Sequence, residues 1–212
     1  MPFAIIIDGP NFINDLNRYF QEEVTRTKYY IMNRLSFPII HGLIQKELKE
    51  KGLYSHPFLG TEFICANKSQ IGPFRGQERT DLLSKLKREI GVKVREVALS
   101  PKEGGEKGVD MTVFVRMLHL GRTTPVTHVV LFASDKDYIP ALEELRDLGI
   151  HTIVVGFKTM SVKGTEINYS EELINESYLY INLKDILDRM DERINTTIPD
   201  ELKCLEFFID SI

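Results

Sequence analysis

The chain has 212 residues, of which 42% are hydrophobic and 27% are charged, so neither a disordered chain nor a coiled coil is indicated. Its formal net charge of -4 argues against a protein that binds nucleic acid through a global excess of positive charge, although a cluster of metal-binding carboxylates would also lower that charge. Cys65 and Cys204 stand in no zinc-binding spacing, and no apolar run approaches the roughly 18 residues of a membrane span. We therefore expect a cytoplasmic protein without a membrane segment.

Short apolar runs alternate along the chain with longer segments of helical periodicity, which is the pattern of parallel strands covered by helices on both faces. Strands are expected over residues 3–7, 59–65, 92–97, 128–133, 151–155 and 178–181, the last as an edge strand. Helices are expected over residues 36–51, 76–90, 110–120, 139–148 and 170–176. Gly121 is expected to close the third of these helices. The sequence thus predicts a three-layer α/β/α sandwich around a mostly parallel sheet.

The remaining segments are expected to be loops and a C-terminal extension. Residues 101–108 and 157–169 are predicted loops, and residues 183–194 and 200–210 are predicted helices. We expect one domain over residues 1–212, with 183–212 as a helical extension. The apolar residues of the last predicted helix could dock on the core or join two copies in a homo-oligomer.

Aspartates follow two of the predicted buried strands. Asp8 comes directly after the first strand, and Asp135 and Asp137 follow the strand at 128–133. Because the carboxyl ends of parallel strands share one edge of the sheet, these side chains can meet although more than a hundred residues separate them. Asp110 opens a predicted helix after a glycine-bearing loop, from which it can reach the same edge. The sequence therefore predicts one acidic pocket that holds all four aspartates.

Several carboxylates that lie close together either raise their pKa values or recruit a cation. Oxygen ligands without paired histidines or cysteines favour Mg²⁺ or Mn²⁺, ions that bind substrate phosphate and promote its attack by water. We therefore expect Asp8, Asp110, Asp135 and Asp137 to be metal ligands and catalytic residues. Asn11 could add a neutral oxygen or orient the substrate.

Most of these residues also have a structural interpretation. Asp110 and Asp137 stand where helices are expected to begin and could be N-caps. Asp135 and Asn11 could be turn residues that use their own side-chain hydrogen bonds. Asp8 is the hardest to explain structurally, because it ends a fully apolar strand and precedes Gly-Pro-Asn.

Some positively charged residues are candidates for binding substrate phosphate. Four lysines fall in loops at the expected strand-end edge, namely Lys107, Lys136, Lys158 and Lys163. The basic residues between Arg75 and Arg88 are spaced like the solvated face of a helix, which is the interpretation we favour. The sequence has no Ser-His-Asp order, G-x-S-x-G element or phosphate-binding loop.

Three segments resemble the NYN domain family, a branch of the PIN-like nucleases, in their order and spacing. They are Ile5-Ile-Ile-Asp-Gly-Pro-Asn11, Lys107-Gly-Val-Asp-Met111 and Ser134-Asp-Lys-Asp-Tyr138. The later segments 154–157 and 170–178 are similar to the end of that domain. The resemblance implies a PIN-like α/β/α fold and a metal-dependent activity on RNA, with Asp8, Asn11, Asp110, Asp135 and Asp137 at the motif positions.

One residue departs from the family pattern. Many relatives carry another aspartate about two turns into the helix after Asp110, where this chain has Arg116. Arg116 could bind substrate phosphate or pair with Asp110. The leading hypothesis is a Mg²⁺- or Mn²⁺-dependent endoribonuclease. The alternatives are an RNA- or protein-binding module with little turnover and, more distantly, a phosphatase for small esters, although the first strand lacks a D-x-D pair.

Overall fold

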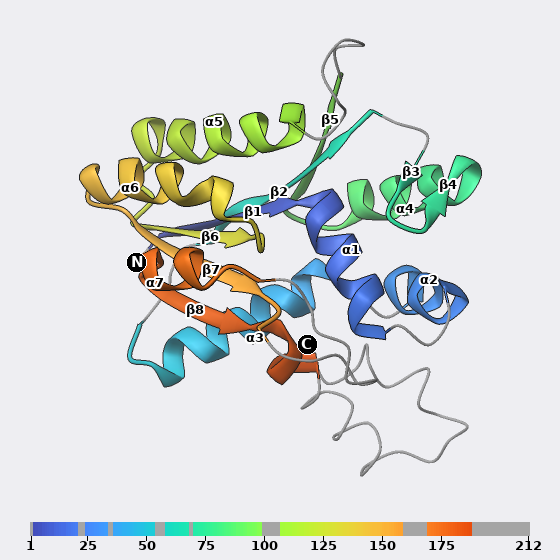
Figure 1. Cartoon of the computed structure of the whole chain (residues 1–212), viewed down its shortest axis with the longest axis horizontal. Helices are drawn as coiled ribbons and strands as arrows, with labels where there is room; N and C mark the ends of the chain where they lie inside the picture. The colour runs from blue at the N-terminus through green and yellow to red at the C-terminus, as the bar shows by residue number, and fades with distance from the viewer. Residues whose placement is uncertain are drawn as a thin grey trace.

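A six-stranded parallel sheet forms the centre of the fold (Figure 1). The computed structural model describes residues 2–20, 24–33, 36–53, 58–67, 70–98, 107–158 and 169–187. The strand order is β5-β2-β1-β6-β7-β8, and every neighbouring pair is parallel. The strands are β1 (Phe3–Asp8), β2 (Phe58–Ala66), β5 (Val92–Val97), β6 (His128–Phe132), β7 (His151–Gly156) and β8 (Leu179–Asn182). All the strands predicted from the apolar runs are therefore confirmed.

Helices cover both faces of this sheet. One face carries α1 (Gly9–Phe20), α2 (Val24–Asn33), α3 (Phe37–Glu50) and α4 (Gly76–Arg88). The other face carries α5 (Lys107–Thr123), α6 (Ile139–Asp147) and α7 (Glu171–Glu176). A short hairpin of β3 (Gln70–Ile71) and β4 (Phe74–Arg75) precedes α4. None of the described helices is long and apolar enough to cross a membrane. The predicted α/β/α sandwich is confirmed.

The first strand shows why an uninterrupted apolar run indicates a central strand. Phe3, Ile5 and Ile7 of β1 pack into the core under α1 to α4, whereas Ala4 and Ile6 pack into the core under α5 to α7. All five are buried. A parallel strand that is covered on both faces has no polar side, so its side chains do not alternate in polarity.

The chain changes direction in the sheet between β1 and β6. After β1 it builds β2 and β5 on one side, and it then returns through α5 to place β6, β7 and β8 on the other side. At such a switch point the loops after the two adjacent strands diverge and leave a crevice at their carboxyl ends, where α/β proteins bind ligands. Asp8 ends β1, and Ser134 and Asp135 follow β6, so these residues flank that crevice.

Two expected boundaries of α5 are wrong. The helix begins at Lys107, three residues before Asp110, so Asp110 is not its N-cap. The helix also continues through Gly121 to Thr123. A Cβ atom at Gly121 would lie 2.7 Å from Cδ1 of Ile150 and 2.8 Å from Cδ2 of Leu145. Gly121 therefore lies where α5 passes close to α6 and the following turn, and a larger residue would push the ends of these two side chains aside; it does not end the helix.

Helices α1 and α2 were not predicted from the sequence. Helix α1 follows β1 without an intervening loop, and Pro10 is its second residue, a position where proline is tolerated because the first turn needs no N–H donor. At the other end of the chain, residues 183–187 are helical. The rest of the predicted extension, including the helix over 200–210, lies outside the described residues.

A charged cluster ties α5 to the sheet. Glu62 of β2 accepts hydrogen bonds from Arg116 of α5, at 2.8 Å from Nε and 2.7 Å from Nη2, and from Nη2 of Arg95 of β5 at 2.9 Å. Burial by itself would raise the pKa of Glu62, but these hydrogen bonds and the two positive charges outweigh it and lower the pKa to about 2. Arg116 is thus paired with Glu62, and the expected alternative of a pair with Asp110 is wrong.

Glu62→Gln should destabilise the protein by about 3 kcal/mol at pH 7, because two half-buried guanidinium groups would lose their counter-ion. Since the pKa of Glu62 is lower in the folded state, its contribution is complete above the ordinary glutamate pKa of 4.5 and is lost as the pH falls toward 2. Urea unfolding should therefore show a difference between wild type and variant that shrinks from pH 7 toward pH 3. Glu143→Gln, on the exposed surface of α6, is the control and should change little. A pH-independent difference would contradict this role.

Candidate functional site

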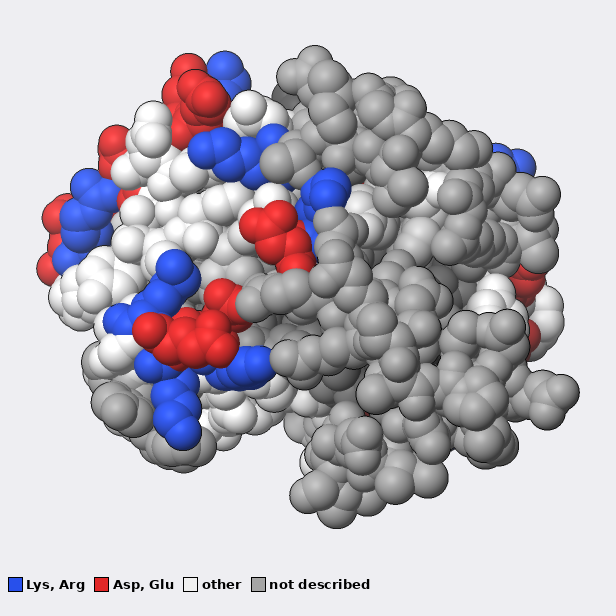
Figure 2. Space-filling model, turned by 90° about the horizontal axis from the view of Figure 1, so that it is seen from below, with Lys and Arg blue, Asp and Glu red and all other residues white. Residues whose placement is uncertain are grey.

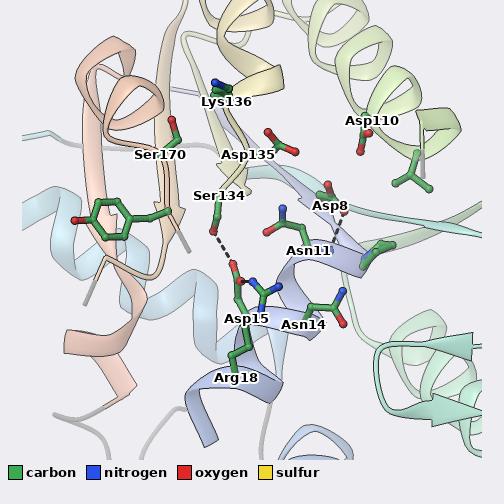
Figure 3. A pocket seen from close by; sticks show the side chains of 13 residues that line it. Asp8, Asn11, Asn14, Asp15, Arg18, Asp110, Ser134, Asp135, Lys136 and Ser170 are labelled. Atoms are coloured by element: carbon green, nitrogen blue, oxygen red, sulfur yellow. Dashed lines mark hydrogen bonds and ion pairs between the residues drawn. The ribbon is translucent and has the colours of Figure 1, made fainter. Parts of the chain in front are cut away.

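A pocket of about 510 Å³ opens at the carboxyl edge of the sheet, at the switch point between β1 and β6 (Figure 3). Four parts of the chain line it: the end of β1 with α1, the start of α5, the segment after β6, and the segment before α7. The lining residues are Asp8, Pro10, Asn11, Asn14, Asp15, Arg18, Val109, Asp110, Ser134, Asp135, Lys136, Tyr169 and Ser170. The pocket thus contains three of the four predicted aspartates, together with Asp15, which was not predicted.

Asp8 is one of two buried carboxylates in the pocket, with 4% of its surface exposed. Its Oδ1 accepts a hydrogen bond from the N–H of Asn11 at 3.1 Å, so Asp8 also caps the first turn of α1. Its Oδ2 accepts a hydrogen bond from the hydroxyl of Tyr138 at 2.6 Å. Burial raises the pKa of Asp8 to about 7 in spite of these two donors. The carboxylate is therefore held in place at a substantial desolvation cost.

The start of α1 is fitted closely against the sheet. A Cβ atom on Gly9 would lie 2.7 Å from the carbonyl oxygen of Ile64 and 2.7 Å from the ring of Phe63, both on β2. Only glycine can therefore occupy this position without a backbone shift. The close approach fixes where Asp8 and Asn11 stand relative to the edge of the sheet.

Tyr138 joins the carboxylates of β1 and α5. It ends a short 3₁₀ helix, η1 (Lys136–Tyr138), that follows β6, and it is 1% exposed. Its hydroxyl lies 3.3 Å from Oδ1 of Asp110 as well as 2.6 Å from Asp8. Burial and the two carboxylates raise the pKa of Tyr138 far above its ordinary value, so the hydroxyl keeps its proton. One proton can bond fully to only one acceptor, so the two carboxylates share this donor.

Asp135 and Asp137 have unequal positions. Asp135 lines the pocket and is the N-cap of η1, because its Oδ1 accepts a hydrogen bond from the N–H of Asp137 at 3.1 Å. Asp137 is exposed and does not line the pocket. The predicted capping role of Asp137 is therefore wrong, since Asp135 performs it. The predicted role of Asp137 as a metal ligand finds no support in its position.

Asp15 is a second buried carboxylate in the pocket, with 4% of its surface exposed. Its Oδ2 accepts a hydrogen bond from Oγ of Ser134 at 2.5 Å, and its Oδ1 accepts one from Nη1 of Arg18 at 3.3 Å. Burial raises the pKa of Asp15 to about 6, although both donors lower it. The signal in the sequence was the spacing of Asn11, Asp15 and Arg18 at i, i+4 and i+7, which places them on one helix face. It was missed because no helix was predicted there.

The predicted phosphate-binding residues are distributed unevenly. Lys136 lines the pocket, with its Nζ 3.8 Å from a carboxylate oxygen of Glu172. Lys107 begins α5, but its side chain is not described. Lys158 is exposed beyond β7, and its N–H donates to Oδ1 of Asn182. Neither Lys158 nor Arg116 lines the pocket, and Lys163 lies outside the described residues.

The oxygen atoms that line the pocket suit a divalent ion that keeps several bound waters better than an ion surrounded entirely by protein ligands. No three His, Cys, Asp or Glu side chains within the described part of the chain are grouped closely enough to hold an ion among them. Asp8 and Asp110 nevertheless reach the same hydroxyl, and Oδ1 of Asn11 is buried without a hydrogen-bond partner in the described structure. Mg²⁺ commonly keeps several waters and takes only one or two carboxylates, a requirement that Asp8 and Asp110 can meet.

The all-parallel sandwich with an acidic pocket at its switch point places the chain in the PIN-like α/β/α class. The NYN domain model matches residues 2–184, so the chain belongs to the NYN domain family, within the PIN-like nuclease superfamily. A solved structure of a protein of unknown function from Vibrio parahaemolyticus has a TM-score of 0.55 and 15% identity, and the match covers 87% of this chain and 93% of that one. This likeness shows the fold alone. No curated protein matches the sequence.

Asp15→Asn should stabilise the protein by up to about 3 kcal/mol at pH 8. Because the folded-state pKa of Asp15 is raised from 3.8 to about 6, wild type loses stability as the pH rises from about 4 through about 6, and the asparagine variant lacks this loss. Thermal unfolding of the two proteins should therefore diverge above pH 6 and converge below pH 4. Asn14→Asp, on the same helix face, is the reverse control and should not be stabilising. Equal stabilities of wild type and Asp15→Asn at pH 8 would contradict the desolvation cost.

Proposed function

We propose that this protein is an endoribonuclease that uses Mg²⁺ or Mn²⁺ to hydrolyse RNA phosphodiesters in the pocket at the switch point. The observation that carries the proposal is that Asp8 and Asp110, which come from different elements, both reach the hydroxyl of Tyr138. Membership of the NYN domain family gives this acidic pair a nuclease context. RNA as the substrate follows from the family and is part of the proposal.

Asp8 and Asp110 would hold the ion, with the amide oxygen of Asn11 as a neutral donor and Asp135 at the rim. When bound, the ion would act as a Lewis acid that polarises the phosphodiester and promotes attack by water. The raised pKa of Asp8 supports the assignment, because a carboxylate that ionises at the expense of desolvation gains most from a nearby cation.

The residues of the chain would supply the positioning. The N–H of Asn11 and the hydroxyl of Tyr138 fix both oxygens of Asp8 before any ligand enters. The Asp8 side chain would therefore need little rearrangement during the reaction. Lys136 at the rim would neutralise part of the phosphate charge. Water would add to phosphorus, the bond from phosphorus to O3′ would break, and the proton would pass to the leaving oxygen. The products would carry a 5′ phosphate and a 3′ hydroxyl.

A second candidate is an RNA-binding module in which the pocket remains but turnover is weak. It is favoured by the absence of a three-carboxylate group among the described residues and by the pairing of Arg116, at a position where relatives carry an acid, with Glu62. This candidate predicts RNA binding by wild type without any cleavage that depends on added metal.

Purified wild type should cleave single-stranded RNA with Mg²⁺ or Mn²⁺, and EDTA should abolish the cleavage. Asp8→Asn and Asp110→Asn should each lower kcat at least about 100-fold, because each removes a charged ligand of the reacting centre. Asp147→Asn, at the exposed end of α6, is the matched control and should keep full activity. Product ends and rates are read on a denaturing gel.

Asp137→Asn tests whether the reacting centre includes all four aspartates predicted from the sequence or only the three that line the pocket. Its side chain lies outside the pocket, so the loss should be less than about tenfold. A loss as large as that of Asp110→Asn would show that the centre extends beyond the pocket. Activity that survives in EDTA, or in Asp8→Asn, would rule out the proposed function.

A further inference from the structure

We propose that the polar face of α1 is a subsite for RNA next to the acidic centre, in which Arg18 binds a phosphate a few nucleotides from the scissile one. Asp15 is the residue that positions Arg18. This face, here named the α1 stripe, consists of Asn11, Asn14, Asp15 and Arg18, all of which line the pocket. The inference rests on the proposed function only in taking RNA as the substrate.

The α1 stripe leads away from the acidic centre. Its residues follow at i, i+3, i+4 and i+7, so they lie on one side of the helix, while Phe12, Ile13 and Leu16 are buried against the core. From Asn11 to Arg18 the helix axis advances about 10 Å, the length that one strand of duplex nucleic acid covers in about three nucleotides. A substrate held at Asp8 and Asp110 can therefore place a phosphate a few nucleotides away beside Arg18.

Arg18 has donors available for a ligand. Its side chain is 46% exposed, and its bond to Asp15 uses one nitrogen at 3.3 Å. A guanidinium group carries five N–H donors in a planar fork that matches two phosphate oxygens. In Figure 3 the side chain runs back along α1 and brings the guanidinium beside the Asp15 carboxylate. The group therefore faces the pocket from which a phosphate would approach.

Asp15 fixes the place of Arg18. It is 4% exposed, and its second oxygen is held by Ser134, two residues after β6, so the carboxylate is anchored to the segment that leaves the sheet. Because Ser134 holds one oxygen of the buried Asp15 carboxylate, the other oxygen gives the long Arg18 side chain a preferred orientation. Without Asp15 the guanidinium would move freely in solvent. Binding a phosphate would then cost more conformational entropy.

The charge distribution makes this one arginine important. The net charge is -4, and on the face shown in Figure 2 acidic and basic side chains are interspersed over the described residues, without a continuous basic field. Arg18 and Lys136 are the cations among the described residues that line the pocket, and Lys136 is mostly exposed near Glu172. Three other arginines, Arg79, Arg95 and Arg116, are bound to glutamates. RNA binding should therefore depend strongly on Arg18.

The test measures binding of a short fluorescent single-stranded RNA by anisotropy over a range of KCl concentrations, in an Asp8→Asn background that prevents cleavage. Arg18→Gln should weaken binding about tenfold, and the slope of log K against log salt should fall in magnitude by about 0.7, the value for one lost phosphate contact on a single strand. Arg122→Gln, at the exposed end of α5, is the control and should bind like its parent. Arg18→Lys should retain the slope and lose part of the affinity.

Asp15→Asn tests the positioning role separately. Removal of a negative charge alone would strengthen RNA binding, whereas loss of the anchor for Arg18 should weaken it several-fold, even though the same variant is expected to be more stable. Tighter binding by Asp15→Asn would overturn this role. A melting temperature measured alongside shows that a loss of binding is not a loss of folding.

The outcomes separate this inference from the proposed function. Unchanged RNA binding by Arg18→Gln, no RNA binding by the parent protein, or equally tight binding of a mononucleotide would each overturn the α1 subsite, even if wild type cleaves RNA with metal. Binding that depends on Arg18 without metal-dependent cleavage by wild type would support the subsite and overturn the nuclease assignment.

Discussion

The hydrogen bond from Tyr138 to the buried carboxylate of Asp8 is the interaction on which the site depends. Asp8 ends β1 and caps α1, while Tyr138 follows β6 and also reaches Asp110 of α5, so one hydroxyl connects the two strands of the switch point and both helical layers. The desolvation that raises the pKa of Asp8 to about 7 is tolerated because Asn11 and Tyr138 donate hydrogen bonds to its two oxygens and the packed strands hold the side chain in place.

Much of the fold could be predicted because its strands are buried on both faces and stand out as apolar runs. The same runs placed Asp8 and Asp135 at one edge of the sheet, since that follows from parallel pairing alone. Helix α1 was not predicted, because it begins at Gly9 without the loop that usually marks a strand-to-helix change. Its polar face, and with it Asp15 and Arg18, was therefore missed.

Contacts between residues that are far apart in the chain could not be predicted from the sequence either. Arg116 and Glu62 are 54 positions apart, and Tyr138 and Asp8 are 130 apart. No local spacing signals such pairs, because they arise only when strand order and helix packing are known. The sequence set Asp8 apart as the hardest of the four predicted aspartates to explain structurally, but it could not give their exposure: Asp8 is buried whereas Asp135 and Asp137 are exposed. Burial separates residues that share a charge and a motif.

The central claim is that Asp8 and Asp110 hold a catalytic divalent ion at the switch point. A crystal structure of the protein soaked with Mn²⁺, with anomalous diffraction data collected at the manganese edge, tests it most directly. We expect an anomalous peak in the pocket, in contact with the carboxylates of Asp8 and Asp110 and lost in Asp8→Asn. A protein that cleaves RNA with Mn²⁺ but binds the ion only elsewhere, or binds it unchanged in Asp8→Asn, would contradict the claim.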